Sequence, residues 1–436
     1  MSASELAALV CCDLGAIVRG RSLPSAELQA AAGAGVGWVP ANHALTPIGT
    51  LAEPNPFGST GDLRLLPDLD THVRVDADGE DGALELVLCD IVETDGRAWE
   101  CCPREFLRSA LAELDGELGL RVRTSFEHEF QLRSEQPAAL PFSLEAQRRA
   151  APFPSLAFAA LEHAGAAPER FMAEYASHQF EIPVAPADGL GGADRAVIVR
   201  EVVREVARRT GTRASFAPLL DPAEAGNGVH IHVSLLDASG LPALYDATRA
   251  GALSELGASF AAGILAHAGA LSALTAASPP SAARLAPHRW SAGAVCLAQR
   301  NREALLRLPP LVALAGDPAQ QLRLEYRGAD AAANPYLALG AIVRAGLDGV
   351  RRALPAPPIL ERDPVELDSA DAERYGVGAL PGSLADALAA LAGDEVARAW
   401  FPPLLYDAYV SVKRAEVDAA AEVDLAELCE RYAAIY

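Results

Sequence analysis

The segment Gly226–Asp237, GNGVHIHVSLLD, joins a glycine-rich turn to a regular alternation of apolar and polar side chains. With a period of two, His230, His232 and Ser234 fall on one face, and the aliphatic residues between them fall on the other. This pattern predicts a β-strand with an apolar back. Histidines two residues apart on a strand lie roughly 7 Å from each other, close enough to aim at one ligand. Taken alone, the pattern is equally consistent with a solvated strand face that carries histidines.

Three other segments repeat this construction: Thr124–Leu132, Ser177–Val184 and Leu322–Arg327. Each alternates apolar with polar residues and so predicts a strand with one apolar and one polar face. Their polar faces carry Glu127 and Glu129, then Gln179 and Glu181 with Glu174 just upstream, and finally Arg323, Glu325 and Arg327. One such strand is usually a solvated surface, but four of them are better explained by a single shared cavity.

The charges of this cavity indicate its ligands. Clustered carboxylates repel one another unless cations lie between them, which predicts bound divalent metal. Oxygen-rich ligation with one imidazole favours Mg²⁺ or Mn²⁺ over zinc. Arginines beside metal-bound carboxylates suit the recognition of phosphate and of a substrate carboxylate.

Composition excludes several classes of function. The 436 residues are 51% hydrophobic and 22% charged, which is typical of a soluble globular protein. The net charge of −22 argues against a nucleic acid or an anionic membrane as partner. Lys413 is the only lysine, which excludes a phosphate-binding loop that depends on lysine.

Cysteine usage and the N-terminal segment bear on location. The seven cysteines form no CxxC pattern, so we expect neither a zinc site nor a disulfide framework, and a reducing cytoplasm fits best. The N-terminal segment MSASELAALV has no basic region, and no uninterrupted apolar run reaches about 18 residues. We therefore expect neither secretion nor membrane insertion.

The order of predicted elements suggests two domains. Strands are predicted at Leu9–Leu14 and Ala83–Val92, with a loop rich in Pro, Gly and Asp at Glu53–Asp70. A helix at Glu105–Asp115 follows, so we place a domain boundary near residue 103. Further helices are predicted at Ser155–Ala164, Ala193–Thr210, Gly251–Ala277, Asn334–Ala353, Ser383–Ala399 and through much of Tyr406–Tyr436.

Along nearly its whole length the chain resembles the glutamine synthetase superfamily. The matching segments, in the order of the family, are Gly61–Asp68, Cys102–Arg104, Glu127–Glu129, Glu174–Glu181, Gly226–Ser234, Arg284, Asn301–Pro309 and Glu325–Gly349. The resemblance implies an α+β fold: a small N-terminal β-grasp domain (1–103) and a catalytic domain (104–436) with an antiparallel sheet flanked by helices. It also implies an ATP-dependent ligase that joins glutamate to an amine through γ-glutamyl phosphate. Such proteins form a ring or double ring (dodecamer) with active sites between subunits.

The resemblance further implies a role for each matching residue. Two or more Mg²⁺ or Mn²⁺ ions would be bound, one by Glu129, Glu174 and Glu181, and a second by Glu127, His230 and Glu325. The residues implied for ATP are His232, Ser234, Arg307 and Arg323. Those implied for glutamate are Arg284, Arg327, Gly226 and Glu129, while Arg302 would neutralise the phosphoryl group during transfer. Arg302, Glu129 and Arg284 are thus the implied catalytic residues.

Two departures from the family pattern concern the amine. Ammonia-using relatives carry an acid in a loop of the N-terminal domain, but Val39–Thr46 has none, and Asn42 is the nearest candidate. They also carry a glutamate on a flap, six residues after the arginine that Arg284 matches, where this chain has Trp290. A site with an indole in place of an acid is poorly suited to concentrate ammonium, but can pack the alkyl or aryl part of a larger amine.

These observations predict a ligase that forms a γ-glutamyl amide from glutamate and a small-molecule amine other than ammonia. One alternative is ordinary glutamine synthesis, with ammonium held by other groups. A second alternative is a non-catalytic member that serves as a structural or regulatory ring. Such a member would be expected to have lost metal ligands, whereas all six implied positions are present.

Overall fold

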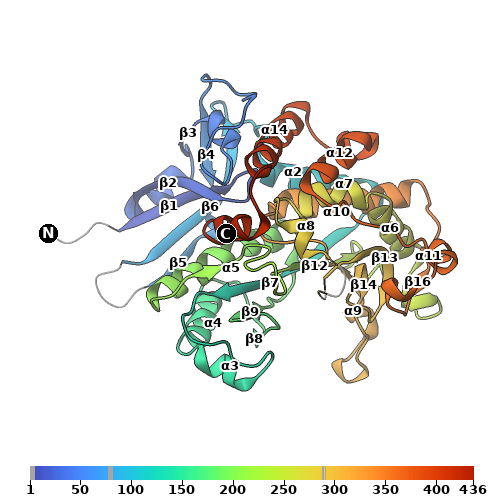
Figure 1. Cartoon of the computed structure of the whole chain (residues 1–436). Coiled ribbons are helices and arrows are strands. Elements are labelled where there is room, and N and C mark those ends of the chain that lie inside the picture. Colours follow the sequence, from blue (N-terminus) through green and yellow to red (C-terminus); the bar gives the residue numbers. More distant parts are fainter. Residues whose placement is uncertain (1–4, 77–81, 287–288, 290) are drawn as a thin grey trace.

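The N-terminal part of the chain folds around a mixed β-sheet (Figure 1). A computed structural model describes residues 5–76, 82–286, 289 and 291–436. The sheet has the order β2-β1-β6-β4-β3, with β5 also paired to β6, and β1 runs parallel to β6. Its strands are β1 (Leu6–Cys12), β2 (Val18–Pro24), β3 (Val36–Trp38), β4 (Leu63–Pro67), β5 (Val73–Val75) and β6 (Leu84–Glu93), with the short helix α1 (Leu28–Ala31) after β2.

Two strand predictions in this part are confirmed to within three residues, since β1 and β6 lie where the pattern placed strands. The prediction that Glu53–Asp70 is a loop throughout is wrong, because β4 lies inside it. Leu63 and Leu65 of β4 are buried and pair with β6. The Pro, Gly and Asp residues around this short alternation made the segment look like a loop.

The second sheet extends across the rest of the chain in the order β16-β13-β14-β15-β12-β7-β9-β8, with β10 and β11 also paired to β7. The predicted antiparallel arrangement is right for β9, β7, β12, β15 and β14, but β13 runs parallel to both β14 and β16, so the sheet is mixed. Its strands are β7 (Arg121–Leu132), β8 (Met172–Ala173), β9 (Gln179–Ile182), β10 (Ala187–Asp188), β11 (Ala214–Ser215), β12 (Val229–Leu236), β13 (Ala294–Gln299), β14 (Ala304–Leu308), β15 (Leu324–Tyr326) and β16 (Ile359–Leu360).

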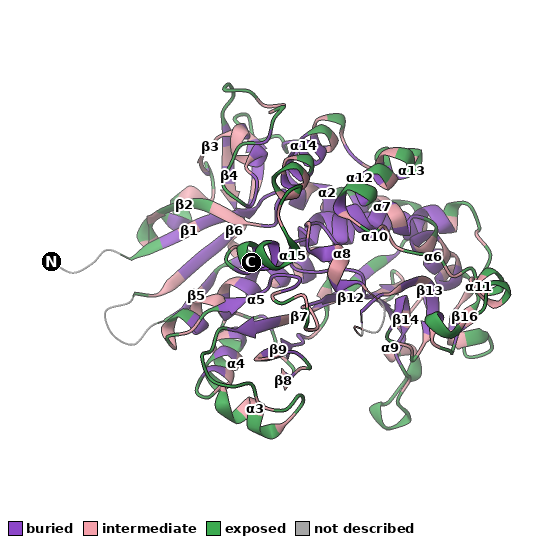
Figure 2. Ribbon diagram, viewed as in Figure 1, coloured by how far each residue is buried: buried purple, intermediate pink, exposed green. Residues whose placement is uncertain are grey.

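Helices cover the apolar back of this sheet and pack on one another. α5 packs against β7, and α10 packs against α2, α5 and α6. Figure 2 shows that α10 and the central strands are mostly buried, whereas α3 and α11 are largely exposed. The helices are α2 (Pro103–Leu118), α3 (Leu144–Arg149), α4 (Phe153–His163), α5 (Gly189–Arg209), α6 (Glu255–Ala266), α7 (Ala268–Thr275), α8 (Ser281–Arg284), α9 (Pro318–Gln321), α10 (Pro335–Arg351), α11 (Ser369–Tyr375), α12 (Leu384–Gly393), α13 (Glu395–Arg398), α14 (Pro403–Ala420) and α15 (Leu425–Ala433).

The single helix predicted at Gly251–Ala277 is instead two helices, α6 and α7, that meet at His267 with a bend of 73°. The His267 ring lies 2.6 Å from Asp394 Oδ2 through Nδ1 and 3.0 Å from Asp348 Oδ2 through Nε2. These contacts tie the bend to α10 and to the start of α13. Within the described ranges, no single helix is long and apolar enough to cross a membrane. Of the described helices, only α6 and α7 taken together reach the required length and apolar composition.

Arg104 links the first sheet to the helices of the second part. Its guanidinium is 3% exposed and donates to Asp68 and Asp90, each at 2.9 Å, and to both carboxylate oxygens of Asp194 on α5. The hydroxyl of Tyr336 on α10 also donates to Asp194, at 2.6 Å. One buried cation thus holds together segments that lie far apart in sequence.

Candidate active site

Strand register places the predicted polar residues side by side. His230 on β12 is directly opposite Glu127 on β7, and Glu129 on β7 is opposite Glu181 on β9. His232 on β12 is opposite Glu325 on β15, which is in turn opposite Arg307 on β14. Because side chains alternate along a strand, these residues share one face of the sheet. The predicted convergence of four strands on one site is confirmed.

The opposite face of the same strands is apolar and buried, as the alternation predicted. Phe126 and Phe130 of β7 and Val229 and Ile231 of β12 are each at most 4% exposed. His128, which lies between the two phenylalanines, is also buried, and burial lowers its pKa to about 3. This histidine belongs to the core and not to the site.

Glu127, His230 and Glu325 form the first acidic group. Their candidate ligand atoms all lie within 4.8 Å of one another, and among the described residues no other His, Cys, Asp or Glu group meets this criterion. Burial, together with Arg327, lowers the pKa of His230 to about 4, so its ring is neutral and can act as a ligand. Burial acts to raise the pKa of Glu325. The charges of Arg327, His230 and His232 outweigh burial and lower this pKa to about 2. Two carboxylates and a neutral imidazole fit a divalent cation.

Glu129, Glu174 and Glu181 form the second acidic group, in which nearby arginines do not offset burial and mutual repulsion. Burial raises the pKa of Glu181 well above its ordinary value, and the negative charges of Glu127, Glu129 and Glu174 raise it further. Burial and the Glu129 charge raise the pKa of Glu174 to about 7. Glu129 accepts a hydrogen bond from the Gly228 backbone N–H at 2.7 Å, yet burial still raises its pKa. Such mutual repulsion is relieved by a bound cation, so this group also fits metal ligation.

The raised pKa of Glu174 predicts how stability depends on pH. In metal-free protein, the unfolded chain loses this proton near pH 4.5 and the folded chain near pH 7, so folding stability falls as pH rises between these values. Glu174→Gln removes the penalty, and from pH 5 to pH 8 we expect the parent to lose about 2 kcal/mol relative to the variant, allowing for solvent screening. Denaturant titration with a chelator present measures this difference.

Saturating Mn²⁺ should reverse the order at pH 8, because glutamine is a weaker metal ligand than ionised glutamate. Glu162→Gln, at an exposed position of α4, is the matched control and should show neither effect. A parent that is more stable than Glu174→Gln at pH 8 without metal would show that these acids are not crowded.

Arginines surround the first acidic group. Arg307 donates to Glu325 Oε2 at 2.6 Å, and Arg327 donates to the other oxygen of that carboxylate. Arg323 Nε donates to His232 Nδ1 at 3.0 Å, which fixes the proton of His232 on Nε2, 2.9 Å from Glu127 Oε1. The site therefore alternates acids with bases across neighbouring strands.

Two cavities of about 420 Å³ each open on either side of the acids. The first, here named the Arg284 cavity, is lined by residues that include Glu129, Glu174, Gly226, His230 and Arg284. The second, the Ser234 cavity, is lined by residues that include Glu127, His232, Ser234 and Arg323. Three of the residues implied for glutamate, Glu129, Gly226 and Arg284, thus line one cavity, and three of those implied for nucleotide, His232, Ser234 and Arg323, line the other. Arg327 and Arg307 are not among the residues that line either cavity.

Close packing at the Arg284 cavity requires glycine at position 226 and leaves little room at position 228. A Cβ on Gly226 would lie 2.1 Å from the Pro218 carbonyl oxygen. A Cβ on Gly228 would lie 3.2 Å from both Arg284 Nη1 and His230 Nε2. The backbone at Pro218 and the side chains of Arg284 and His230 thus pack closely against the GNG turn, which explains why the turn is rich in glycine.

The remaining predicted residues lie as follows. Arg327 is buried and its Nε donates to the Arg302 carbonyl at 3.0 Å, while the Arg302 side chain is exposed and lines neither cavity. Arg284 is 2% exposed and donates to the Ala329 carbonyl at 2.9 Å. Trp290 lies outside the described residues. Asn42, in a short turn of helix after β3, is not among the described residues that line either cavity.

Sequence reasoning missed Asn227 as part of the site. Its side chain is 1% exposed, donates to the Ala217 carbonyl at 2.9 Å and accepts from Gln179 Nε2 at 3.0 Å. Gln179 also donates to the Gly226 carbonyl at 2.9 Å, so the pair fixes the turn against β9. An asparagine between two glycines was the available signal, since it can satisfy turn backbone groups through its amide.

Comparison with known proteins assigns the chain to a family. The family model described as the glutamine synthetase N-terminal domain matches residues 1–99, and the catalytic-domain model of the same family matches residues 100–430. The chain belongs to the glutamine synthetase family. Members of this family are ATP-dependent ligases that form a carbon–nitrogen bond, and this chain is one of them.

Similar members of the glutamine synthetase family differ in the substrates that their names state. Gamma-glutamylpolyamine synthetase GlnA3 of Streptomyces coelicolor is 35% identical over 423 residues, covering 94% of this chain and 89% of that protein. Glutamine synthetase of Methanocaldococcus jannaschii is 31% identical over 368 residues, covering 82% and 80% respectively.

Solved structures of the family agree with this fold. A crystal structure described as a novel glutamine synthase homolog superposes with a TM-score of 0.92 at 45% identity, covering 100% of this chain and 99% of that one. A structure of GmaS with ADP gives a TM-score of 0.79 at 25% identity, covering 97% and 95%. The chain therefore has the glutamine synthetase fold of an N-terminal mixed-sheet domain and a catalytic domain of sheet and helices.

Proposed function

We propose that this ligase forms a γ-glutamyl amide from glutamate and an amine other than ammonia. The observation that carries the proposal is a combination: both acidic groups of the site are complete, whereas the two acids that would attract ammonium are missing. The loop Val39–Thr46 contains no acid, and Trp290 occupies the position of the flap glutamate. The name of the Streptomyces coelicolor relative, a gamma-glutamylpolyamine synthetase, supports an organic amine as acceptor.

The proposed reaction has two steps. The γ-carboxylate of glutamate attacks the terminal phosphorus of ATP, which releases ADP and leaves γ-glutamyl phosphate. The amine nitrogen then attacks the γ-carbonyl carbon, the new C–N bond replaces the C–O bond to phosphate, and inorganic phosphate leaves with the bonding electrons. The nitrogen loses one proton, for which an ionised carboxylate of the site is the acceptor.

Within this scheme the side chains bind and position the reactants. Arg284 lines its cavity, and a guanidinium there suits a substrate carboxylate. We assign Arg327 to the same carboxylate, Gly226 and Glu129 to the amino group, and Arg302 to the phosphoryl group in transfer. The metals, when bound by the two acidic groups, would neutralise the phosphates of ATP. We assign Glu129, Glu174 and Glu181 to one ion, and Glu127, His230 and Glu325 to the other.

We assign the Ser234 cavity to ATP, which gives a prediction for Arg323. Arg323→Met removes a charge-assisted hydrogen bond to phosphate and should raise KM for ATP about tenfold or more, with KM for glutamate changed far less. Steady-state kinetics with each substrate varied in turn measures the split. Arg249→Met removes an exposed ion pair with Glu255. This control variant should change neither KM value. Equal increases in both KM values would argue against a nucleotide role.

The organisation of the protein around this site is also proposed from the resemblance. We propose an N-terminal β-grasp domain that ends near residue 103, a ring or double ring with active sites between subunits, and action in the cytoplasm. Ring assembly predicts a solution mass that is a multiple of the 45.5 kDa chain, which light scattering measures directly.

One alternative retains support: ordinary glutamine synthesis is favoured by the names of several relatives that are about 30% identical. The non-catalytic ring is not retained, because the chain is a ligase by family. Phosphate release with glutamate, ATP and a panel of amines separates the two remaining functions. We expect an organic amine to give a higher kcat/KM than ammonium, and ammonium as the best acceptor would favour glutamine synthesis.

A further inference from the structure

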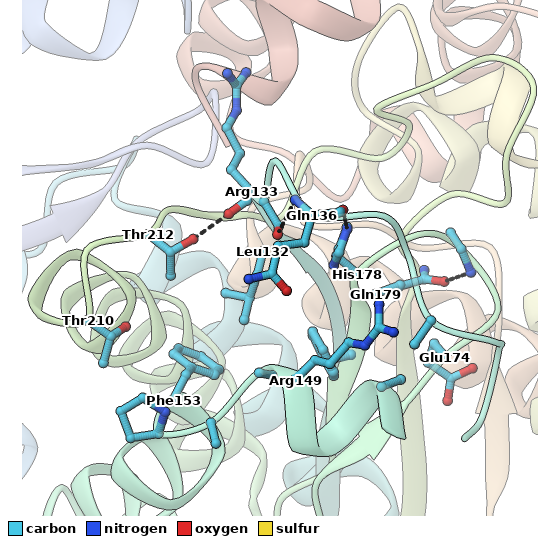
Figure 3. Close-up of a pocket in the computed structure, with 18 of the residues that line it drawn as sticks. Leu132, Arg133, Gln136, Arg149, Phe153, Glu174, His178, Gln179, Thr210 and Thr212 are labelled. Atoms are coloured by element: carbon cyan, nitrogen blue, oxygen red, sulfur yellow. Dashed lines mark hydrogen bonds between the residues drawn. The ribbon is translucent and has the colours of Figure 1, made fainter. Parts of the chain in front are cut away.

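A third cavity lies behind the hairpin that joins β8 to β9. This side cavity, of about 280 Å³, is bounded by the end of β7, by α3, by the start of α4 and by the hairpin itself (Figure 3). Its volume is near the lower end of the range for small-molecule sites. No role has been given to it so far.

The side cavity and the Arg284 cavity share one wall. Glu174 and Gln179 line both cavities, and they are the first and last residues of the hairpin turn. Between them, Tyr175 lines the Arg284 cavity, whereas Ala176 and His178 line the side cavity. Only one short turn of chain separates the two spaces, so the two cavities lie side by side with Glu174 between them.

The lining of the side cavity is apolar at its base. Leu132, Phe153 and Phe180 are buried, with 7%, 1% and 2% of their surfaces exposed. At the rim Leu140 is 76% exposed and adds apolar surface beside the opening. These walls suit a hydrocarbon or aryl group.

The side cavity has few charged groups. Arg133 and Arg149 line it, against Glu174 as the only acid among the described lining residues. Figure 3 shows Arg149 extending toward Gln179 and Glu174, whereas Arg133 points away from the other labelled side chains. Arg149 also donates to the Pro137 carbonyl at 2.9 Å and pairs with Glu145 on its own helix at 2.5 Å, which fixes its position over the cavity. A second ammonium group in this cavity would lie beside a guanidinium.

We propose that the side cavity holds the substituent of the acceptor amine while the reactive nitrogen lies in the Arg284 cavity. The acceptors would then be primary amines with a single apolar alkyl or aryl substituent, and not diamines or polyamines. This inference rests on the proposed function and narrows its substrate class. It also departs from the polyamine named for the Streptomyces coelicolor relative.

The first test fills the side cavity. Ala146 on α3 lines it, so Ala146→Trp should lower kcat/KM for phenethylamine at least about tenfold and leave methylamine, which does not reach the cavity, within about twofold. Ala159→Trp, at an exposed position of α4 outside the cavity, is the matched control and should leave both amines unchanged. Thermal unfolding of each variant shows whether it is folded.

The second test inverts the charge and does not depend on filling the cavity. Arg149→Glu should raise kcat/KM for putrescine relative to phenethylamine at least about tenfold, because the second ammonium would then meet an acid. The neighbouring exposed Arg148 does not line the cavity, and Arg148→Glu should leave that ratio unchanged.

The outcomes separate this inference from the proposed function. Putrescine or spermidine as the best acceptor of the parent, or phenethylamine turnover unaffected by Ala146→Trp, would overturn the side-cavity assignment alone. Ammonium as the best acceptor of the parent would overturn the proposed function, and the inference with it. Phenethylamine ahead of ammonium and putrescine, with turnover lost in Ala146→Trp, would support both.

Discussion

Glu325→Gln should reduce kcat/KM for ligation by about 10³-fold, the largest effect that we expect from a single substitution in the site. Glu325 is 1% exposed and has candidate ligand atoms close to those of Glu127 and His230. It also accepts from Arg307 and Arg327, so the carboxylate proposed as a metal ligand also orients two arginines. Glutamine keeps the shape of the side chain but removes the charge on which both functions depend.

Two measurements check this prediction. Initial rates give the loss of activity, and calorimetric titration with Mn²⁺ should show weaker binding of at least one ion. Glu361→Gln, which alters an exposed acid, should change neither. A Glu325→Gln protein that is folded and retains more than about a tenth of parental activity would contradict the role given to this carboxylate.

Arg104→Met should lower the free energy of unfolding by about 3–5 kcal/mol, the largest expected effect on stability. The guanidinium is buried and faces the carboxylates of Asp68, Asp90 and Asp194. Methionine fills a similar volume but leaves Asp68 and Asp194 without this cation, whereas Asp90 keeps its pair with Arg108. The expected loss therefore reflects the uncompensated carboxylates more than the value of any single ion pair.

Denaturant titration of the parent and variant measures this change. Arg97→Met is the matched control, because Arg97 pairs with Asp95 at 2.7 Å but is 77% exposed, and such pairs contribute about 0–1 kcal/mol. The loss in Arg104→Met should shrink at low pH, where the three acids become protonated. Equal stability of the two variants at neutral pH would show that the buried cluster is not needed to join the two parts.

Strand periodicity carried most of what the sequence could predict about the site. β7 and β12 alternate so regularly that both the strands and their inward faces could be predicted, including Glu127, Glu129, His230 and His232. Their apolar partners are buried as expected. A period of two is a local property of the chain, so it can be recognised in the sequence without knowledge of tertiary contacts.

Features that depend on tertiary contacts could not be predicted in the same way. The bend between α6 and α7 follows from contacts of His267 with Asp348 and Asp394, which are distant in sequence. The parallel pairing of β13 with β14 and β16 depends on a connection that no local pattern specifies. β4 was hidden by its neighbours, because five residues are too few to outweigh a surrounding loop composition.

The site, too, has features that follow from local pattern and features that depend on tertiary contacts. That acids from several segments share one face could be predicted, but the extra contacts of Asn227 and Gln179 with the glycine turn depend on how β9 packs beside it. That Glu129, Gly226 and Arg284 line one cavity, whereas His232, Ser234 and Arg323 line another, also required the folded structure.

A competition experiment tests the choice of acceptor most directly. Protein, glutamate, ATP and Mn²⁺ are incubated with equal concentrations of ammonium and of a primary organic amine such as phenethylamine, at a pH where both are mostly protonated. The products are identified by mass spectrometry. We expect the γ-glutamyl amide of the organic amine to exceed glutamine in this mixture. Glutamine as the main product for every amine tried would contradict the account.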